Sequence, residues 1–171
     1  GLYNTALEYY ESGDYEKGYD YIVNTALNDK EQYNASELAN LYYMAAECSF
    51  GLEQYDTAAK LYASSLDIQD GNSSIYCNYA IALAYSGSSA EAEEILKKAV
   101  DAGALSVMTS YNSLDGIPST ASGELYNDIL RRQWGFRGFV VSDLYSIDGI
   151  WETHHVARDL QEAGMMALRA G

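Results

Sequence analysis

The sequence predicts a chain in two parts: all-α helical hairpins over residues 1–103, then an α/β segment of strand–helix–strand–helix order over residues 104–171. The first observation is charge, because residues 1–103 carry 17 acidic and 5 basic residues, whereas residues 104–171 carry 8 and 5. The second is that 14 of the 17 tyrosines precede residue 104. The third is the hydrophobic pattern, which changes at Gly103 from helical spacing to short apolar runs typical of buried strands.

Three segments of the first part share one pattern. In each, a turn follows an apolar helical stretch, and a second helix then has a small residue early in its length, namely Gly18, Ala58 or Ala92. A small residue at this point lets two helix backbones approach closely. The side chains four and eight positions later, which we expect to fill the space between hairpins, are Ile22 and Ala26, Tyr62 and Leu66, and Leu96 and Val100. One hairpin cannot bury its own apolar face, so about three are needed for a stable stack.

The phrases GDYEKGYDYI, LEQYDTAAKLYASSLDI and GSSAEAEEILKKAV resemble the tetratricopeptide repeat (TPR) family over about residues 1–103. The resemblance implies stacked hairpins that present a concave surface to a peptide or partner protein. The proline that usually closes the second helix is missing. The interval from Gly18 to Ala58 is six residues longer than the interval from Ala58 to Ala92, and we place this excess in a loop around residues 28–34. Tyrosines at helical spacing favour core and hairpin-contact roles over a dedicated aromatic binding groove.

The second part predicts two buried strands, over residues 104–110 and 138–142. Between them, Ser122 or Thr120 can cap an amphipathic helix. A loop rich in Ser, Asp and Gly follows the second strand, and residues 158–170 form another helix. The inner face of that last helix is expected to contain Leu160, Ala163, Gly164, Ala167 and Leu168. A connection of this length joins parallel strands.

Polar residues follow both strands, with Tyr111 after the first and Asp143 after the second. Parallel α/β proteins build their sites at this end of the strands. From the residues alone, a single Asp after a strand is more often a turn or capping residue than a catalytic one. Asp148, Glu152 and His154 lie nearby in the sequence, and we interpret each as a solvated loop or helix-start residue.

The phrases SVMTSYNSLDGIPSTAS, LRRQWGFRGFVVSDLYSIDGIWETHHVA and DLQEAGMMALRAG resemble the later barrel strands of glycoside hydrolase family 3, the β-glucosidase family, over about residues 101–171. The resemblance implies a fragment of a (β/α)8 barrel and retaining hydrolysis of a β-linked sugar. It also implies that Asp143, in the pair Ser142-Asp143, is the nucleophile and that Tyr111 binds the sugar. Leu144 follows the nucleophile where the family often has Trp.

Much of such an enzyme is missing from this chain. A whole barrel takes about 200–250 residues, and the family's upstream Lys-His pair and its general acid/base are absent. Retaining hydrolysis needs two carboxyl groups about 5 Å apart, and only one is identifiable. We therefore expect a truncated or chimeric chain that is inactive alone and is joined near residue 103. The alternative is a TPR-type interaction module with an incidental tail.

Composition excludes several other classes. The net charge of −15 repels phosphate backbones and anionic lipid, so a nucleic-acid partner is not expected. No apolar run approaches the ~20 residues of a membrane-spanning helix. Cys48 and Cys77 predict two buried free thiols, and the adjacent His154 and His155 do not share a helix face, so no metal or cofactor is expected. The location is open, with a secreted or periplasmic one favoured.

Overall fold

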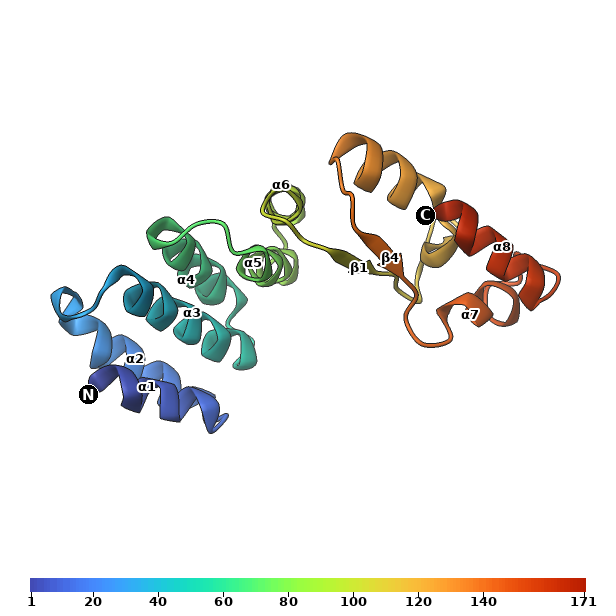
Figure 1. Ribbon diagram of the computed structural model, residues 1–171. Helices are drawn as coiled ribbons and strands as arrows, with labels where there is room; N and C mark the ends of the chain where they lie inside the picture. The colour runs from blue at the N-terminus through green and yellow to red at the C-terminus, as the bar shows by residue number, and fades with distance from the viewer. The chain divides into compact units, whose positions relative to one another are not determined.

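The computed structural model describes all residues 1–171 and divides into two compact units, Gly1–Ala102 and Gly103–Gly171. We call them the helical unit and the α/β unit. Figure 1 shows that the first consists of helices alone, whereas the second combines strands with helices. Neither unit has a helix with the length and apolar character that a bilayer crossing requires.

The helical unit contains six α-helices. They are α1 (Leu2–Glu11), α2 (Tyr15–Asn24), α3 (Ala35–Gly51), α4 (Tyr55–Ile68), α5 (Ser73–Tyr85) and α6 (Ser89–Asp101). Each helix packs against the next, and α1 also packs against α3. Two single turns of 3-10 helix, Ala26–Asn28 and Lys30–Gln32, occupy the long connection between α2 and α3. The extra residues of the first interval therefore lie in the loop where we expected them.

The turns α1–α2, α3–α4 and α5–α6 share one left-handed backbone position. Gly13, Glu53 and Gly87 have φ angles of 73°, 60° and 89°. In the α3–α4 turn, the N–H of Gln54 also donates to the carbonyl of Ser49 at 2.9 Å, the six-to-one hydrogen bond of a Schellman motif. Glu53 therefore takes the same left-handed conformation as the two glycines, although this conformation costs a non-glycine residue about 1 kcal/mol.

Side-chain caps define where α2, α3 and α5 begin, and at α2 the carboxylate of Asp14 accepts the N–H of Lys17. The N–H of Glu37 donates to Asn34 Oδ1 at 2.9 Å, and the N–H of Asn34 donates to Glu37 Oε2 at 3.0 Å, which forms a capping box at the start of α3. At the start of α5, Asn72 Oδ1 accepts the N–H groups of Ser74 and Ile75. Each cap satisfies backbone donors that have no partner inside the helix.

The three small residues at the start of α2, α4 and α6 are all buried, as expected. Ala58 is fully buried, Ala92 is 5% exposed, and Gly18 is also buried. A Cβ atom added at Gly18 would lie 3.0 Å from Cys48 Sγ on α3. That distance is closer than ordinary carbon–sulfur contact, so a side chain at position 18 would require Cys48 to shift by a few tenths of an ångström.

The side chains expected to fill the space between hairpins are buried in the first two hairpins and not in the third. The buried ones are Ile22, Ala26, Tyr62 and Leu66. In α6, Leu96 is 38% exposed, and Ile95 and Ala99 are buried instead. The expectation for Leu96 is therefore wrong. Its physical reason is that α6 is the last helix of the unit and packs there against α5.

Residues 1–103 expressed alone are expected to give a strongly helical circular dichroism spectrum and a cooperative thermal melt. The reason is that both apolar clusters of buried residues, one on α1–α3 and one on α3–α6, lie wholly inside the helical unit. The measurement is the dichroism at 222 nm, as a spectrum and against temperature. A random-coil spectrum would contradict the expectation.

Both cysteines are free thiols, with Cys48 buried as expected and Cys77 half-buried. Burial raises the pKa of the Cys48 thiol from 9.0 to about 11. At pH 8 two pKa units lower the thiolate fraction about a hundredfold. We therefore expect iodoacetamide to alkylate Cys48 in a Cys77→Ser variant about a hundredfold more slowly than in the same chain unfolded in urea, as mass spectrometry would measure. Equal rates in the folded and unfolded chains would contradict this.

The α/β unit has two small sheets and three longer helices. Its elements are β1 (Ser106–Met108), β2 (Ser113–Leu114), β3 (Ile117–Pro118), a 3-10 turn (Ser119–Ala121), a helix at Glu124–Gln133, β4 (Phe139–Val141), α7 (Ser146–Glu152) and α8 (Leu160–Ala170). β1 and β4 are parallel, as expected, with Ser106 opposite Phe139 and Met108 opposite Val141. β2 and β3 form an antiparallel hairpin around the left-handed pair Asp115-Gly116.

The helix between the two parallel strands is present, with wider turns than an α-helix. Of the two capping residues considered, Ser122 is the one whose hydroxyl accepts the N–H of Leu125, at 3.3 Å, whereas the buried Thr120 hydroxyl contacts that of Thr109. The helix has π-type hydrogen bonds, such as Trp134 N–H to the Ile129 carbonyl at 2.9 Å.

The expectation of fully buried strands is wrong for one face of the β1–β4 pair. Val107 and Val140 are half-buried, but Met108 is 62% and Phe139 61% exposed. Because successive side chains of a strand point to opposite faces, the pair is covered on one face and open on the other.

Two further expectations about the C-terminal end are wrong. The short helix α7 occupies part of the segment predicted to be a loop. On α8, Leu160 is 49% and Leu168 84% exposed, whereas Ala163 and Ala170 are buried. α8 packs on α7 and on the 3-10 turn, so the small residues rather than the leucines face its neighbours.

Candidate active site

The candidate site lies where β1 and β4 end. Because the two strands are parallel and in register, the residues that follow them leave the sheet at the same edge. The N–H of Thr109 donates to the carbonyl of Val141 at 2.9 Å, which continues the strand pairing by one residue. Tyr111 then follows β1, and Asp143 follows β4.

The structure brings Tyr111 and Asp143 together. The Tyr111 hydroxyl donates to the carbonyl oxygen of Leu144 at 2.5 Å, and the N–H of Leu144 donates to Asp143 Oδ1 at 2.7 Å. Partial removal from water raises the pKa of the Tyr111 hydroxyl, and the negative charge of the nearby Asp143 carboxylate raises that pKa further. Both predicted site residues thus bond to the backbone of Leu144, Tyr111 to its carbonyl and Asp143 to its N–H.

Three buried hydroxyl groups lie beneath the strand ends. Thr109 Oγ1 is 2.9 Å from Thr120 Oγ1 and 3.2 Å from Ser146 Oγ. Each of these residues is only 4% exposed. They tie the end of β1 to the 3-10 turn and to the start of α7, so they position the segment that contains Asp143. The sequence interpretation did not single out Thr109 or Ser146, because isolated hydroxyl residues have no distinctive pattern.

The chain turns sharply between Asp143 and α7. Tyr145 has a φ of 62°, in the left-handed region, where a residue with a bulky side chain pays about 1–3 kcal/mol. The N–H of Ser146 donates to the carbonyl of Asp143 at 3.0 Å and closes the turn. Unfavourable backbone of this kind is concentrated at functional sites, which supports attention to this turn.

A pocket of about 250 Å³ adjoins Tyr111. Asp148 and Glu152 from α7 line it together with Tyr145 and His154. The carbonyl of Tyr111 can only accept, so His154 Nε2 donates to it, at 2.9 Å. Glu152 is exposed, as expected for a solvated residue, but Asp148 and His154 are half-buried and face the same pocket.

A carboxylate and a tyrosine at the carboxyl ends of parallel strands form the kind of site that α/β enzymes build. Comparison with known proteins also relates this part of the chain to an enzyme family. Residues 93–171 match the family model described as the glycosyl hydrolase family 3 N terminal domain.

Curated relatives of the same part are glycosidases by name. A periplasmic beta-glucosidase of Salmonella typhimurium is 43% identical over 75 residues, which are 44% of this chain and 10% of that protein. Beta-D-xylosidase 3 of Arabidopsis thaliana is 39% identical over 72 residues, 42% of this chain and 9% of that protein. Beta-xylosidase/alpha-L-arabinofuranosidase 2 of Medicago sativa subsp. varia is 33% identical over 72 residues, with the same shares.

The chain spans about a tenth of the length of these relatives. The resemblance of the second part to glycoside hydrolase family 3 is confirmed. The resemblance of residues 1–103 to tetratricopeptide repeats stays a prediction, as do the roles of Asp143 and Tyr111.

Proposed function

We propose that residues 103–171 are a piece of the catalytic domain of a retaining glycoside hydrolase that acts on a β-linked sugar. Asp143 is its nucleophile, and Tyr111 helps to bind the sugar beside it. The observation that carries the proposal is that both residues meet at the carboxyl ends of two parallel strands, joined through the backbone of Leu144. The similarity of this part to glycosidases gives the chemistry.

The local geometry suits a nucleophile. The Leu144 N–H engages Asp143 Oδ1, which leaves Oδ2 without a protein partner and free to attack an anomeric carbon. Attack would form a covalent glycosyl-enzyme and release the leaving group, and water would then cleave the ester. The leaving oxygen needs a proton from a second carboxyl group about 5 Å away. We propose that this acid comes from parts of the domain outside this chain.

The open face of the β1–β4 pair supports a barrel origin. In a (β/α)8 barrel the helices cover the outer face of the strands, and side chains of other strands fill the interior. Here the face with Val107 and Val140 is partly covered, and the face with Met108 and Phe139 is exposed. The exposed side chains are those that the missing strands would cover.

A hybrid enzyme tests the proposal. Residues 103–171 would replace the matching segment of the periplasmic beta-glucosidase of Salmonella typhimurium, to which they are similar. We expect the hybrid to hydrolyse 4-nitrophenyl β-glucoside, whereas the 171-residue chain should show no turnover. A hybrid that melts cooperatively and yet lacks activity would overturn the proposal.

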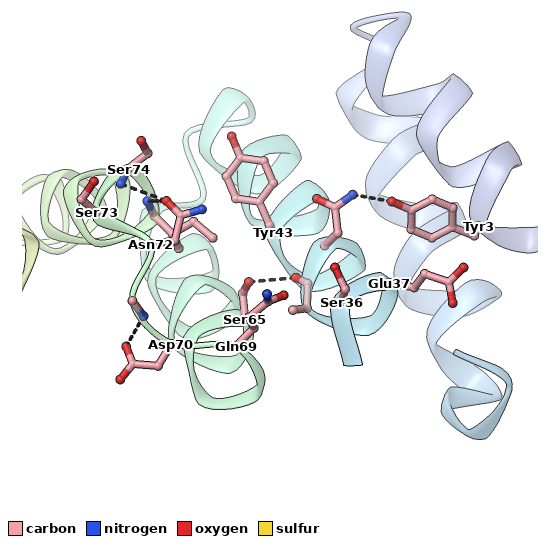
Figure 2. A pocket seen from close by; sticks show the side chains of 14 residues that line it. Tyr3, Ser36, Glu37, Tyr43, Ser65, Gln69, Asp70, Asn72, Ser73 and Ser74 are labelled. Carbon is pink, nitrogen blue, oxygen red and sulfur yellow. Dashed lines mark hydrogen bonds between the residues drawn. The ribbon is translucent and has the colours of Figure 1, made fainter. Parts of the chain in front are cut away.

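We propose a second function for the helical unit, that of a module that binds a peptide segment of a partner protein. The observation in its favour is a pocket of about 750 Å³ between α1, α3 and the α4–α5 connection, shown in Figure 2. The resemblance to tetratricopeptide repeats points to the same activity. The two functions are compatible, because each belongs to one unit.

A further inference from the structure

The pocket of the helical unit has a mixed lining. Its walls come from Tyr3 on α1, from five residues of α3 (Ser36, Glu37, Ala39, Asn40 and Tyr43), from Ser65 on α4 and from Gln69 to Ile75 around the α4–α5 connection (Figure 2). Its volume of about 750 Å³ lies within the range of 300–1,000 Å³ typical of ligand sites. Polar side chains predominate among the labelled residues, so an occupant must make hydrogen bonds as well as apolar contact.

The charged side chains in the lining are both acidic, Glu37 and Asp70. Each carboxylate is oriented by its own element through one oxygen. Glu37 Oε2 accepts the N–H of Asn34, and Asp70 Oδ1 accepts the Gly71 N–H at 2.6 Å and the Tyr76 hydroxyl at 2.5 Å. Glu37 Oε1 and Asp70 Oδ2 have no partner in the protein, so each is available to an occupant.

The Asp70 carboxylate is ionised at neutral pH. The hydrogen bond from the Tyr76 hydroxyl lowers the pKa of Asp70, and the bond from the Gly71 N–H lowers it further. An occupant of the pocket therefore meets a negative charge on the α4–α5 side, opposite the Glu37 side chain on α3.

Neutral hydrogen-bonding groups surround these charges. The side chains of Ser36, Gln69 and Ser73 make no hydrogen bond within the protein and line the pocket. Asn40 donates to the Tyr3 hydroxyl at 2.6 Å, which leaves its carbonyl oxygen as an acceptor. Donors and acceptors in this mixture match the alternating N–H and C=O groups of an extended peptide.

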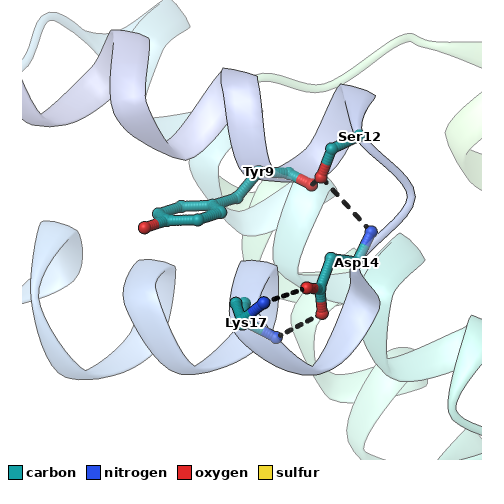
Figure 3. Close-up of polar contacts among 4 residues, drawn as sticks. All are labelled: Tyr9, Ser12, Asp14 and Lys17. Atoms are coloured by element: carbon teal, nitrogen blue, oxygen red, sulfur yellow. Dashed lines mark hydrogen bonds and ion pairs between the residues drawn. The ribbon is translucent and has the colours of Figure 1, made fainter.

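The net negative charge of the whole helical unit also favours a basic occupant. Residues 1–103 carry 17 acidic and 5 basic residues, and their acids engage some of those bases. Lys17 Nζ is 2.7 Å from Asp14, whose carboxylate also accepts the Lys17 N–H (Figure 3), and Lys97 Nζ is 2.8 Å from Asp101. The resulting field attracts basic segments and repels acidic ones.

We infer that the partner segment of this pocket is basic, an extended peptide whose Lys or Arg side chains reach Glu37 at one end of the pocket and Asp70 at the other (Figure 2). The inference rests on the proposed role of the helical unit as a peptide-binding module, and it names the chemistry of the partner. An acidic segment would place like charges together in the pocket, which costs affinity.

Selection from a random octapeptide display library on the full 171-residue chain tests the inference. We expect the enriched peptides to carry at least one Lys or Arg. Synthetic copies of them should bind the E37Q/D70N double variant at least about tenfold more weakly and should weaken as NaCl is raised, because the pocket is open to solvent. Both substitutions keep a side-chain oxygen in place, so the capping box and the Tyr76 contact can persist without the charge.

The matched control is the E93Q/E94Q double variant. It removes the same two charges from exposed positions on α6, outside the pocket, and should bind the same peptides within about twofold of the original chain. Enrichment of acidic or uncharged peptides, or equal losses in both double variants, would overturn the inference and leave the binding module standing. Failure to enrich any peptide would overturn both.

Discussion

Replacing Asp143 by asparagine in the hybrid enzyme is expected to abolish hydrolysis of 4-nitrophenyl β-glucoside, with kcat at least about a thousandfold lower. The amide of asparagine is isosteric and can still accept the Leu144 N–H, which contacts Asp143 Oδ1 at 2.7 Å. What it lacks is the negative charge and nucleophilicity needed to form the glycosyl-enzyme. Initial rates at saturating substrate provide the measurement.

A matched control is Asp128→Asn. Asp128 is on the helix before β4 and pairs with Arg132 on the surface, so its replacement should leave kcat within about twofold, since exposed ion pairs contribute little. A covalent adduct on the peptide that contains Asp143, formed with a slowly hydrolysed 2-fluoro-glucoside, would identify the attacking residue by mass spectrometry. Retained activity in the Asp143→Asn hybrid would show that another group attacks the sugar.

Leu41→Ala is expected to lower the free energy of unfolding of the helical unit by about 2–5 kcal/mol. Leu41 is completely buried on α3 and belongs to the cluster that also contains Ala6, Ile22 and Met44. Truncation removes apolar contacts and leaves a cavity that rigid neighbouring helices close only in part. Urea unfolding followed by dichroism at 222 nm gives the change.

Leu96→Ala makes the same chemical change at a position that is 38% exposed. Its expected cost is below about 1 kcal/mol, because water already reaches the side chain. Equal losses in the two variants would mean that Leu41 does not contribute to the core in the way the structure indicates.

The helical hairpins were predictable because their signals are local. A small residue, a turn and apolar residues at helical spacing occur within about thirty residues of one another, and periodicity records them directly. Leu96 has the same spacing as Tyr62 and yet is partly exposed. Whether a neighbour covers a position depends on where the stack of helices ends, which spacing does not encode.

The α/β unit was predictable in order and less so in detail. The β1–β4 pairing followed from two apolar runs and the length between them. The helix α7 was missed because it is only seven residues long and contains Gly149, which lowers helix propensity. One-sided burial of the strands was missed because a short apolar run looks the same whether one face or both are covered.

The candidate site was predicted from the resemblance of its sequence motifs to a known family, and not from hydrophobic periodicity or residue spacing. Asp143 alone looks like a turn residue, and only the resemblance of its surroundings singled it out. The hydroxyl contacts of Thr109 join residues 11 and 37 positions apart. No local pattern signals such contacts, since they exist only once the two strands and α7 have come together.

The division of the chain into two units also divides its chromophores. Both tryptophans, Trp134 and Trp151, belong to the α/β unit, whereas the helical unit has fourteen tyrosines and no tryptophan. Light that only indole absorbs therefore excites the α/β unit alone. The indole N–H of Trp151 is buried without a partner, so the fluorescence emission of Trp151 should shift to longer wavelength when the unit unfolds and water reaches the ring. The intact chain thus contains its own spectroscopic label for one unit, and a single denaturant titration can rank the stabilities of the two halves without cutting between them.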